Sequence, residues 1–355
     1  MKLYSCSNCN NSLYFENTVC LNCNHTVGFD SQQLSMLTIQ KNPGNADYSD
    51  IKNNYSYRYC QNAQQGNCNW LVPANSTFTF CLACDLNRTI PPLNNPQSKE
   101  RWDKIEIAKH RLIYSLLRLN LPVLKKINNS IEGIAFDFKA DVSPDEKVMT
   151  GHDEGVITLN IDEADDAERV KHKLDLGEKY RTLLGHFRHE IGHYYWDVLI
   201  QKSNYLNEFR RLFGNETIDY EEALQNYYKA TPITNWQNQF ISVYATSHPW
   251  EDWAETWAHY MHVMDTLETA YWFGVGLSTP QLNQNNMNTV ITVDPYTVSD
   301  FKKLFDMWVP LTFAVNNLNR SMGYSDFYPF IISEKIVEKL SFIHDVCKAN
   351  RQVNE

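Results

Sequence analysis

Several stretches of the chain carry apolar residues at the spacing of an amphipathic helix. The clearest runs from about 97 to 120, where the apolar positions recur every three or four residues and therefore share one face (Ile105, Ala108, Leu112, Ile113, Leu116 and Leu117). Asn95 and Pro96 are a suitable cap and first turn. Helical patterns also cover about 177–201, 203–230, 249–262, 298–308 and 333–343, where Ser333 is a possible cap.

The period changes to that of strands in two short regions. In residues 133–138 and 156–161, apolar residues either alternate with polar ones or follow one another over the length of a strand. Thr150–Gly155 between them predicts a turn. We expect the strand 156–161 to be the edge of a small sheet, where an extended peptide would pair. An ordinary core strand is the alternative. The alternating tyrosines at 55–59 predict a further strand.

Composition favours a globular protein in a reducing compartment. The chain has 355 residues, 43% of them hydrophobic, and a net charge of −10, which argues against nucleic acid and anionic membranes as partners. We see neither a secretory signal nor a run of about 20 apolar residues, so we expect a cytoplasmic protein without a membrane span. In that compartment nine cysteines favour metal sites over disulfides.

Two groups of cysteines have the spacing of structural zinc sites. Cys6 and Cys9, with Cys20 and Cys23, form two C-x-x-C pairs that can place four thiolates around one ion. We expect residues 1–30 to be a zinc ribbon held together by its metal, because the segment is too short for a core. His25 is an alternative ligand that four cysteines make unnecessary.

The second group is less regular. Cys60 and Cys68 precede the pair Cys81 and Cys84, and a second four-cysteine zinc module over 55–90 explains all four, whereas a redox C-x-x-C leaves the first two unexplained. The polar segment 31–54 then predicts a linker. Cys347, the ninth cysteine, is expected to be a free thiol.

The N-terminal region shows no nucleic-acid signature. Residues 1–95 contain five basic and five acidic side chains, so the basic patch that a phosphate backbone requires is absent. We therefore expect the cysteine modules to have a structural role or to dock a protein partner. The remaining residues 96–355 are expected to form one mostly helical domain with a small sheet, which makes the chain an α+β protein.

The strongest chemical motif is His189-Glu190-Ile191-Gly192-His193. Residues four apart on a helix are neighbours, so His189 and His193 can bind one metal ion, and Glu190 can take a proton from an attacking water. His186, one turn earlier, either supports this site or packs. A helix that carries these residues by chance is the alternative, and a third ligand decides between the two.

A later helix supplies that ligand. The extended pattern with a third histidine on the same helix is excluded, because Trp196 and Leu199 stand where it needs Gly and His. Glu251 is the best-placed ligand, and Glu255 can fix a ligand histidine. Ala254 and Ala258 allow a close approach of the two helices. The rival ligands are three histidines of the same region (His248, His259 and His262).

The pair of motifs resembles the gluzincin class of zinc peptidases. The cysteine pairs, the stretches 68–73, 81–90 and 150–160, and the motifs at 186–196 and 248–259 together resemble a bacterial family of zinc-binding metallopeptidases with an N-terminal zinc ribbon. The resemblance covers nearly the whole chain and implies a zincin-like domain. In some gluzincins a tyrosine about two turns before the glutamate ligand stabilises the tetrahedral intermediate, which makes Tyr244 a candidate for that role. Tyr194 and Tyr195 are weaker candidates.

These observations predict a zinc-dependent peptidase that acts on a peptide or protein, with one catalytic and two structural zinc ions. The alternative is a zinc-ribbon adaptor whose peptidase domain is inactive or latent. The intact Glu190 favours the enzyme, because a degenerate domain is expected to lose its general base first.

Overall fold

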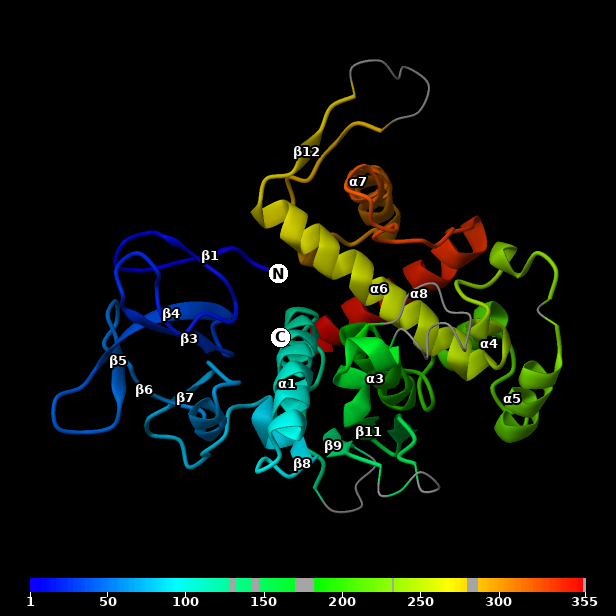
Figure 1. Cartoon of the computed structure of the whole chain (residues 1–355). Coiled ribbons are helices and arrows are strands. Elements are labelled where there is room, and N and C mark those ends of the chain that lie inside the picture. Colours follow the sequence, from blue (N-terminus) through cyan, green and yellow to red (C-terminus); the bar gives the residue numbers. More distant parts are fainter. Residues whose placement is uncertain are drawn as a thin grey trace. The chain divides into compact units, whose positions relative to one another are not determined.

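The protein is described by a computed structural model that covers residues 1–127, 132–141, 143, 147–169, 182–231, 233–279 and 287–353. The chain forms two compact units, one of residues 1–118 and 122–168, the other of 119–121 and 169–355. Strands dominate the first half of the chain and helices the second (Figure 1). The fold class is therefore α+β, as the sequence predicted.

The first unit begins with a small hairpin and a five-stranded antiparallel sheet. Strands β1 (Tyr4–Ser5) and β2 (Ser12–Leu13) form the hairpin that carries the first cysteine pair. The sheet has the order β3-β4-β5-β6-β7. Its strands are β3 (Thr26–Asp30), β4 (Ser35–Lys41), β5 (Tyr48–Asp50), β6 (Ser56–Tyr59) and β7 (Leu71–Pro73).

The expected linker at 31–54 is wrong. The segment contains two strands, β4 and β5. Leu37 and Ile39 of β4 pack with Tyr57 and Leu71 in a small core, and Tyr48 of β5 packs against it. One continuous sheet therefore joins the segments that carry the two cysteine groups. The boundaries predicted for the separate modules and for the domain at 96–355 stay predictions.

A long helix and a second sheet complete the first unit. Helix α1 (Pro96–Arg118) begins at the predicted residue, and Asn95 is its cap, because Asn95 Oδ1 accepts the backbone N–H of Gln97 at 2.9 Å. The sheet has the order β10-β11-β9-β8. Its strands are β8 (Asn87–Thr89), β9 (Ala135–Lys139), β10 (Gly151–Asp153) and β11 (Val156–Asn160).

The expectation that strand 156–161 is a sheet edge is wrong. Strand β11 lies between β9, its parallel neighbour, and β10, its antiparallel neighbour. Residues 151–153, expected in a turn, form β10 and take the edge position, and the turn shrinks to Glu154 and Gly155. A hairpin this tight has no sequence signal apart from its glycine, which has a φ of 81° that favours glycine.

The second unit is a bundle of helices. Helix α3 (Leu183–Leu199) packs along α6 (Pro249–Trp272), and α7 (Phe301–Ser321) and α8 (Glu334–Val353) pack against α6 (Figure 1). The shorter α4 (Leu206–Phe213) and α5 (Tyr220–Lys229) divide the helical region expected at 203–230. A two-stranded ribbon pairs β12 (Gly276–Leu277) with β13 (Thr289–Val290).

Helices α1, α6 and α8 begin where the patterns indicate, whereas α6, α7 and α8 extend 10 to 13 residues beyond the expected ends at 262, 308 and 343. Pro249 occupies the first turn of α6, and Ser333 Oγ accepts the N–H of Ile336 at the start of α8, 3.4 Å away. Helix α3 begins at the cap Thr182, and the expected residues 177–181 lie outside the described part of the chain. Cys347 is buried in α8, so it is a packed thiol.

Candidate metal centres

The α3–α6 contact is close because small residues meet on both helices. A Cβ atom added to Gly192 would lie 3.1 Å from Cα of Ala254 and 3.2 Å from Cβ of Trp257. The indole N–H of Trp253 also donates to the carbonyl of Gly192 at 2.9 Å. This approach allows a carboxylate on α6 to reach histidines on α3.

The structure brings His189, His193 and Glu251 together. The Nε2 atoms of the two histidines lie 3.2 Å apart, and Glu251 places Oε2 3.0 Å from Nε2 of His189 and Oε1 3.5 Å from Nε2 of His193. Ligands bound tetrahedrally to zinc at 2.0–2.1 Å would be separated by about 3.3 Å. The three side chains are also buried, Glu251 to 1% exposure.

The chemistry of these donors fits a cation. Nδ1 of His189 lies 2.7 Å from Oε1 of Glu255, so the ring can donate there and keep its Nε2 lone pair for a metal ion bound between the three residues. Burial would lower the pKa of His189, but Glu251 and Glu255 hold it well above its ordinary value. Burial would raise the pKa of Glu251, yet His193 and His189 hold it well below. The cluster therefore attracts positive charge.

Glu190 lies beside this group, buried on α3. Its Oε1 is 3.2 Å from Nε2 of His186, one turn earlier on the helix. Burial would raise the pKa of Glu190, but the contact with His186 lowers it, so the carboxylate is ionised. His186 thus contacts the candidate base, a relation that its spacing of four residues from Glu190 could have indicated.

Two tyrosines border the site. The ring of Tyr244, in a short 3₁₀ helix (Tyr244–Thr246), lies 6.0 Å from the ring of His189 between centroids. Burial and, to a smaller extent, the negative charge of Glu251 raise the pKa of Tyr244, so its hydroxyl keeps its proton. Tyr220, at the start of α5, donates from its hydroxyl to Oε1 of Glu251 at 2.6 Å. No sequence pattern points to Tyr220, because 31 residues separate it from Glu251.

The rival ligands are committed elsewhere. His248 caps α6, since its Nδ1 accepts the N–H of Trp250 at 3.0 Å. His259 contacts the hydroxyl of Tyr328 at 2.5 Å, and His262 contacts Arg188 at 2.5 Å. His152, which is not one of these rivals, accepts the N–H of Gly155 within its own hairpin at 2.9 Å.

Other aromatic residues of the motif region pack. Tyr195 stacks on Trp257 with centroids 5.1 Å apart, and Tyr194 lies against Tyr195 at 5.0 Å. Both tyrosines are at most 2% exposed. The contacts of these two rings are those of core residues, whereas Tyr244 and Tyr220 reach the polar group on α3 and α6.

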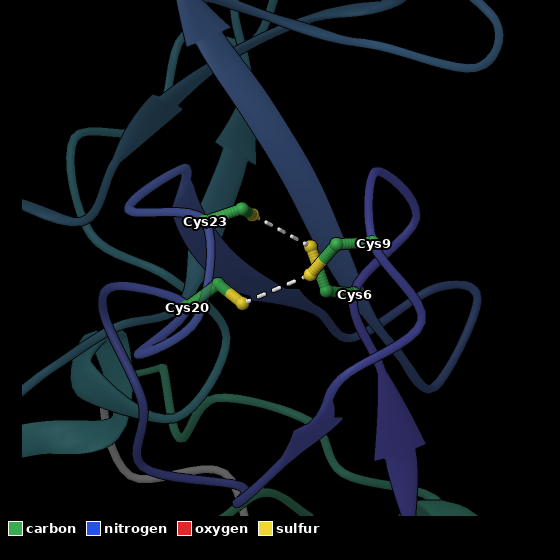
Figure 2. A group of neighbouring side chains, drawn as sticks. All are labelled: Cys6, Cys9, Cys20 and Cys23. Carbon is green, nitrogen blue, oxygen red and sulfur yellow. Dashed lines mark hydrogen bonds between the residues drawn. The ribbon is translucent and has the colours of Figure 1, made fainter.

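The first cysteine group also has the geometry of a metal site. The sulfur atoms of Cys6 and Cys23 lie 3.6 Å apart, as do those of Cys9 and Cys20 (Figure 2). Disulfides would require about 2.05 Å, whereas thiolates on a tetrahedral zinc ion are separated by about 3.8 Å. The four residues come from two hairpin turns, and all are free cysteines.

The second cysteine group is more deeply buried. Cys60, Cys68, Cys81 and Cys84 place their sulfur atoms within 4.8 Å of one another, and none is more than 7% exposed. Backbone N–H groups point at these sulfurs, for example from Cys81 to Cys60 at 3.3 Å and from Trp70 to Cys68 at 3.5 Å. Four convergent sulfurs with such donors fit a structural zinc ion.

The geometry defines a class of protein with a buried His-His-Glu group on two packed helices and two separate four-cysteine groups. Residues 98–346 match the family described as "Putative zinc-binding metallo-peptidase", and residues 3–95 match a zinc-ribbon domain. The chain belongs to this zinc-binding metallopeptidase family, which confirms the resemblance seen in the sequence.

Individual relatives are also similar over nearly the whole chain. Proteins of Mycobacterium tuberculosis and Mycobacterium bovis, each named as uncharacterized, are 40% identical over 347 residues, which cover 98% of this chain and 95% of theirs. No solved structure matches the chain. Among the described residues, no helix has the length and apolar character needed to cross a membrane.

Proposed function

We propose that the protein hydrolyses peptide bonds at the site formed by α3 and α6. His189, His193 and Glu251 would hold the catalytic zinc. The observation that carries this proposal is the convergence of donor atoms from these three residues at 3.0–3.5 Å, with the ionised Glu190 beside them. Family membership supports the same chemistry.

Zinc bound at this site would supply Lewis-acid chemistry, which lowers the pKa of water and polarises a carbonyl group. Glu190 acts as the general base: its carboxylate takes a proton from the attacking water and delivers it to the leaving amine. His186 holds that carboxylate from the preceding turn, 3.2 Å away. A single side chain thus serves both proton transfers.

Three further residues complete the proposed machinery. Tyr244 keeps its proton and would donate a hydrogen bond to the carbonyl oxygen as negative charge develops on it. Glu255 orients His189 through Nδ1. Tyr220 holds Oε1 of Glu251, so that Oε2 faces His189.

The test is cleavage of a peptide library by zinc-loaded protein and by Glu190→Gln. The amide cannot accept the proton, so we expect the variant to retain zinc and fold but to lose cleavage by about 100-fold or more. Glu208→Gln, an exposed substitution on α4, is the matched control and should cleave like the wild type. Equal cleavage by Glu190→Gln would refute the role of Glu190. Absence of cleavage by zinc-loaded wild type would favour a binding protein with an inactive peptidase domain.

A further inference from the structure

Helix α1 carries a buried polar cluster that contacts the second cysteine group. Glu106 and Lys109 are 0% exposed and His110 is 4% exposed. Burying three such side chains is costly unless each finds a partner. Nothing in the sequence pattern of this amphipathic helix assigns them a role, and none of them belongs to the α3–α6 site.

His110 points directly at two of the cysteines. Its Nε2 atom lies 3.4 Å from Sγ of Cys68 and 3.6 Å from Sγ of Cys84. Its other nitrogen, Nδ1, lies 2.6 Å from the backbone carbonyl oxygen of Glu106. A carbonyl oxygen only accepts, so Nδ1 carries a proton and the ring is held with Nε2 towards the two sulfurs. Nε2 donates to them when it is protonated as well, which makes the ring an imidazolium cation.

The rest of the cluster fixes α1 against its surroundings. Glu106 accepts from Lys109 at 2.8 Å and from Asn87, in β8, at 2.9 Å. Lys109 also donates to Asn87 and lies over the rings of Phe136 and Phe138 in β9. The ion pair of Glu106 and Lys109 balances its own charge. Oε2 of Glu106 also lies 3.6 Å from Sγ of Cys84, but a carboxylate has no proton to donate to a thiolate. His110 is therefore the side chain of this α1 cluster that can donate to the sulfurs.

The contact between His110 and the sulfurs is explained by the negative charge of a zinc-bound cysteine group. Four thiolates around Zn²⁺ carry a net charge of −2, and the second cysteine group is too buried for water to solvate that charge. An N–H group shared between two thiolates stabilises them and fixes their positions. In the first group Cys9 and Cys23 are partly exposed, and a neutral group, the hydroxyl of Thr38, donates to Cys6 at 3.5 Å.

We propose that His110 is a positioning residue of the second zinc site, where its imidazolium ring donates from Nε2 to the ligand sulfurs of Cys68 and Cys84 and offsets part of their negative charge. It lies outside the set of four ligands and joins the site to helix α1. The match to the zinc-ribbon family ends at residue 95 and that to the peptidase family begins at 98. The second zinc site thus extends across the point where the two families meet, and its metal stabilises α1 as well as the cysteine loops. This inference does not depend on catalysis.

The experiment compares the full chain loaded with cadmium-113 or zinc with His110→Ala and His110→Gln. Cadmium NMR gives each thiolate site its own resonance, and Cys9→Ser identifies the resonance of the first site. For His110→Ala we expect the second resonance to move and zinc release from that site to a chelator to accelerate by about 10-fold or more. The first resonance should stay in place, which makes that site an internal control.

Two variants separate a specific contact from simple destabilisation. His110→Gln, whose amide N–H can reach the same sulfurs, should restore part of the zinc retention. Leu112→Ala, a buried change on the same helix, should lower the melting temperature without moving the second resonance. An unchanged resonance and release rate in His110→Ala would overturn the proposal. A shift to the position of a three-sulfur site would also overturn it, because His110 would then be a ligand.

Discussion

Nδ1 of His189 lies 2.7 Å from Oε1 of Glu255, one helical turn beyond Glu251 on α6. The same helix thus provides the carboxylate that approaches Nε2 of His189 and the one that holds its opposite nitrogen. A single displacement of α6 would disturb both contacts. The site therefore depends on the register of two helices as much as on its residues.

Glu255→Gln tests the orienting contact. The amide remains able to accept a hydrogen bond but carries no charge, so the basicity of His189 falls while its position is largely kept. We expect zinc affinity at the α3–α6 site to fall about 10-fold or more, measured by competition with a chelator. The exposed substitution Glu208→Gln is the control. Unchanged affinity would show that Glu255 does not act through His189.

Gly192→Val tests the approach of the helices. Even a Cβ atom would lie 3.1 Å from Cα of Ala254, so the larger side chain must push α6 away from α3. We expect the catalytic zinc to be lost and the melting temperature to fall. Leu199→Ala, which opens a cavity at the far end of α3, should lower the melting temperature but retain the zinc. Retention of zinc by Gly192→Val would contradict the importance of the close packing.

The zinc count tests all three sites together. Elemental analysis should give three ions per chain for the wild type and two for His189→Ala, whose cysteine modules should stay folded. Mild chelation should empty the α3–α6 site first, because it keeps an open position on a domain with its own core. A count that His189→Ala leaves unchanged would exclude the catalytic site. A single cysteine-bound ion in the wild type would exclude the second cysteine site.

The pH dependence of stability tests the buried His259. Burial lowers the pKa of this histidine to about 4, and its Nδ1 contacts the hydroxyl of Tyr328. A lowered histidine pKa means that its contribution is present above the unfolded pKa of about 6.5 and is lost as the pH falls towards 4. We expect the free energy of unfolding of His259→Asn to fall less steeply in this window. The difference between the two chains should change by roughly 3 kcal/mol.

Chemical denaturation at several pH values measures this difference. Protonation of the zinc ligands affects both chains, so it cancels in the comparison. Equal slopes for the two chains between pH 6.5 and 4 would show that His259 is not held neutral in the folded protein.

The local motifs were predictable because backbone geometry alone sets the distance between residues that are close in sequence. Four residues on a helix bring His189 beside His193, and two residues between cysteines bring their sulfurs together, whatever surrounds them. Glu251 and Glu255 could be placed on one face of α6 for the same reason. The fold class and the family followed from these patterns as well.

The tertiary structure alone decided which distant groups meet. Tyr220 reaches Glu251 across 31 residues and His110 reaches Cys68 across 42, and no periodicity encodes such contacts. Strand β11 lost its expected edge position because a short hairpin added β10 beside it. His248, His259 and His262 had the chemistry of ligands, but packing gave each a different partner. The sequence determines which side chains share a face of one helix or one loop. Contacts between separate elements depend on how their surfaces pack, and packing is the sum of many small interaction energies over the whole core.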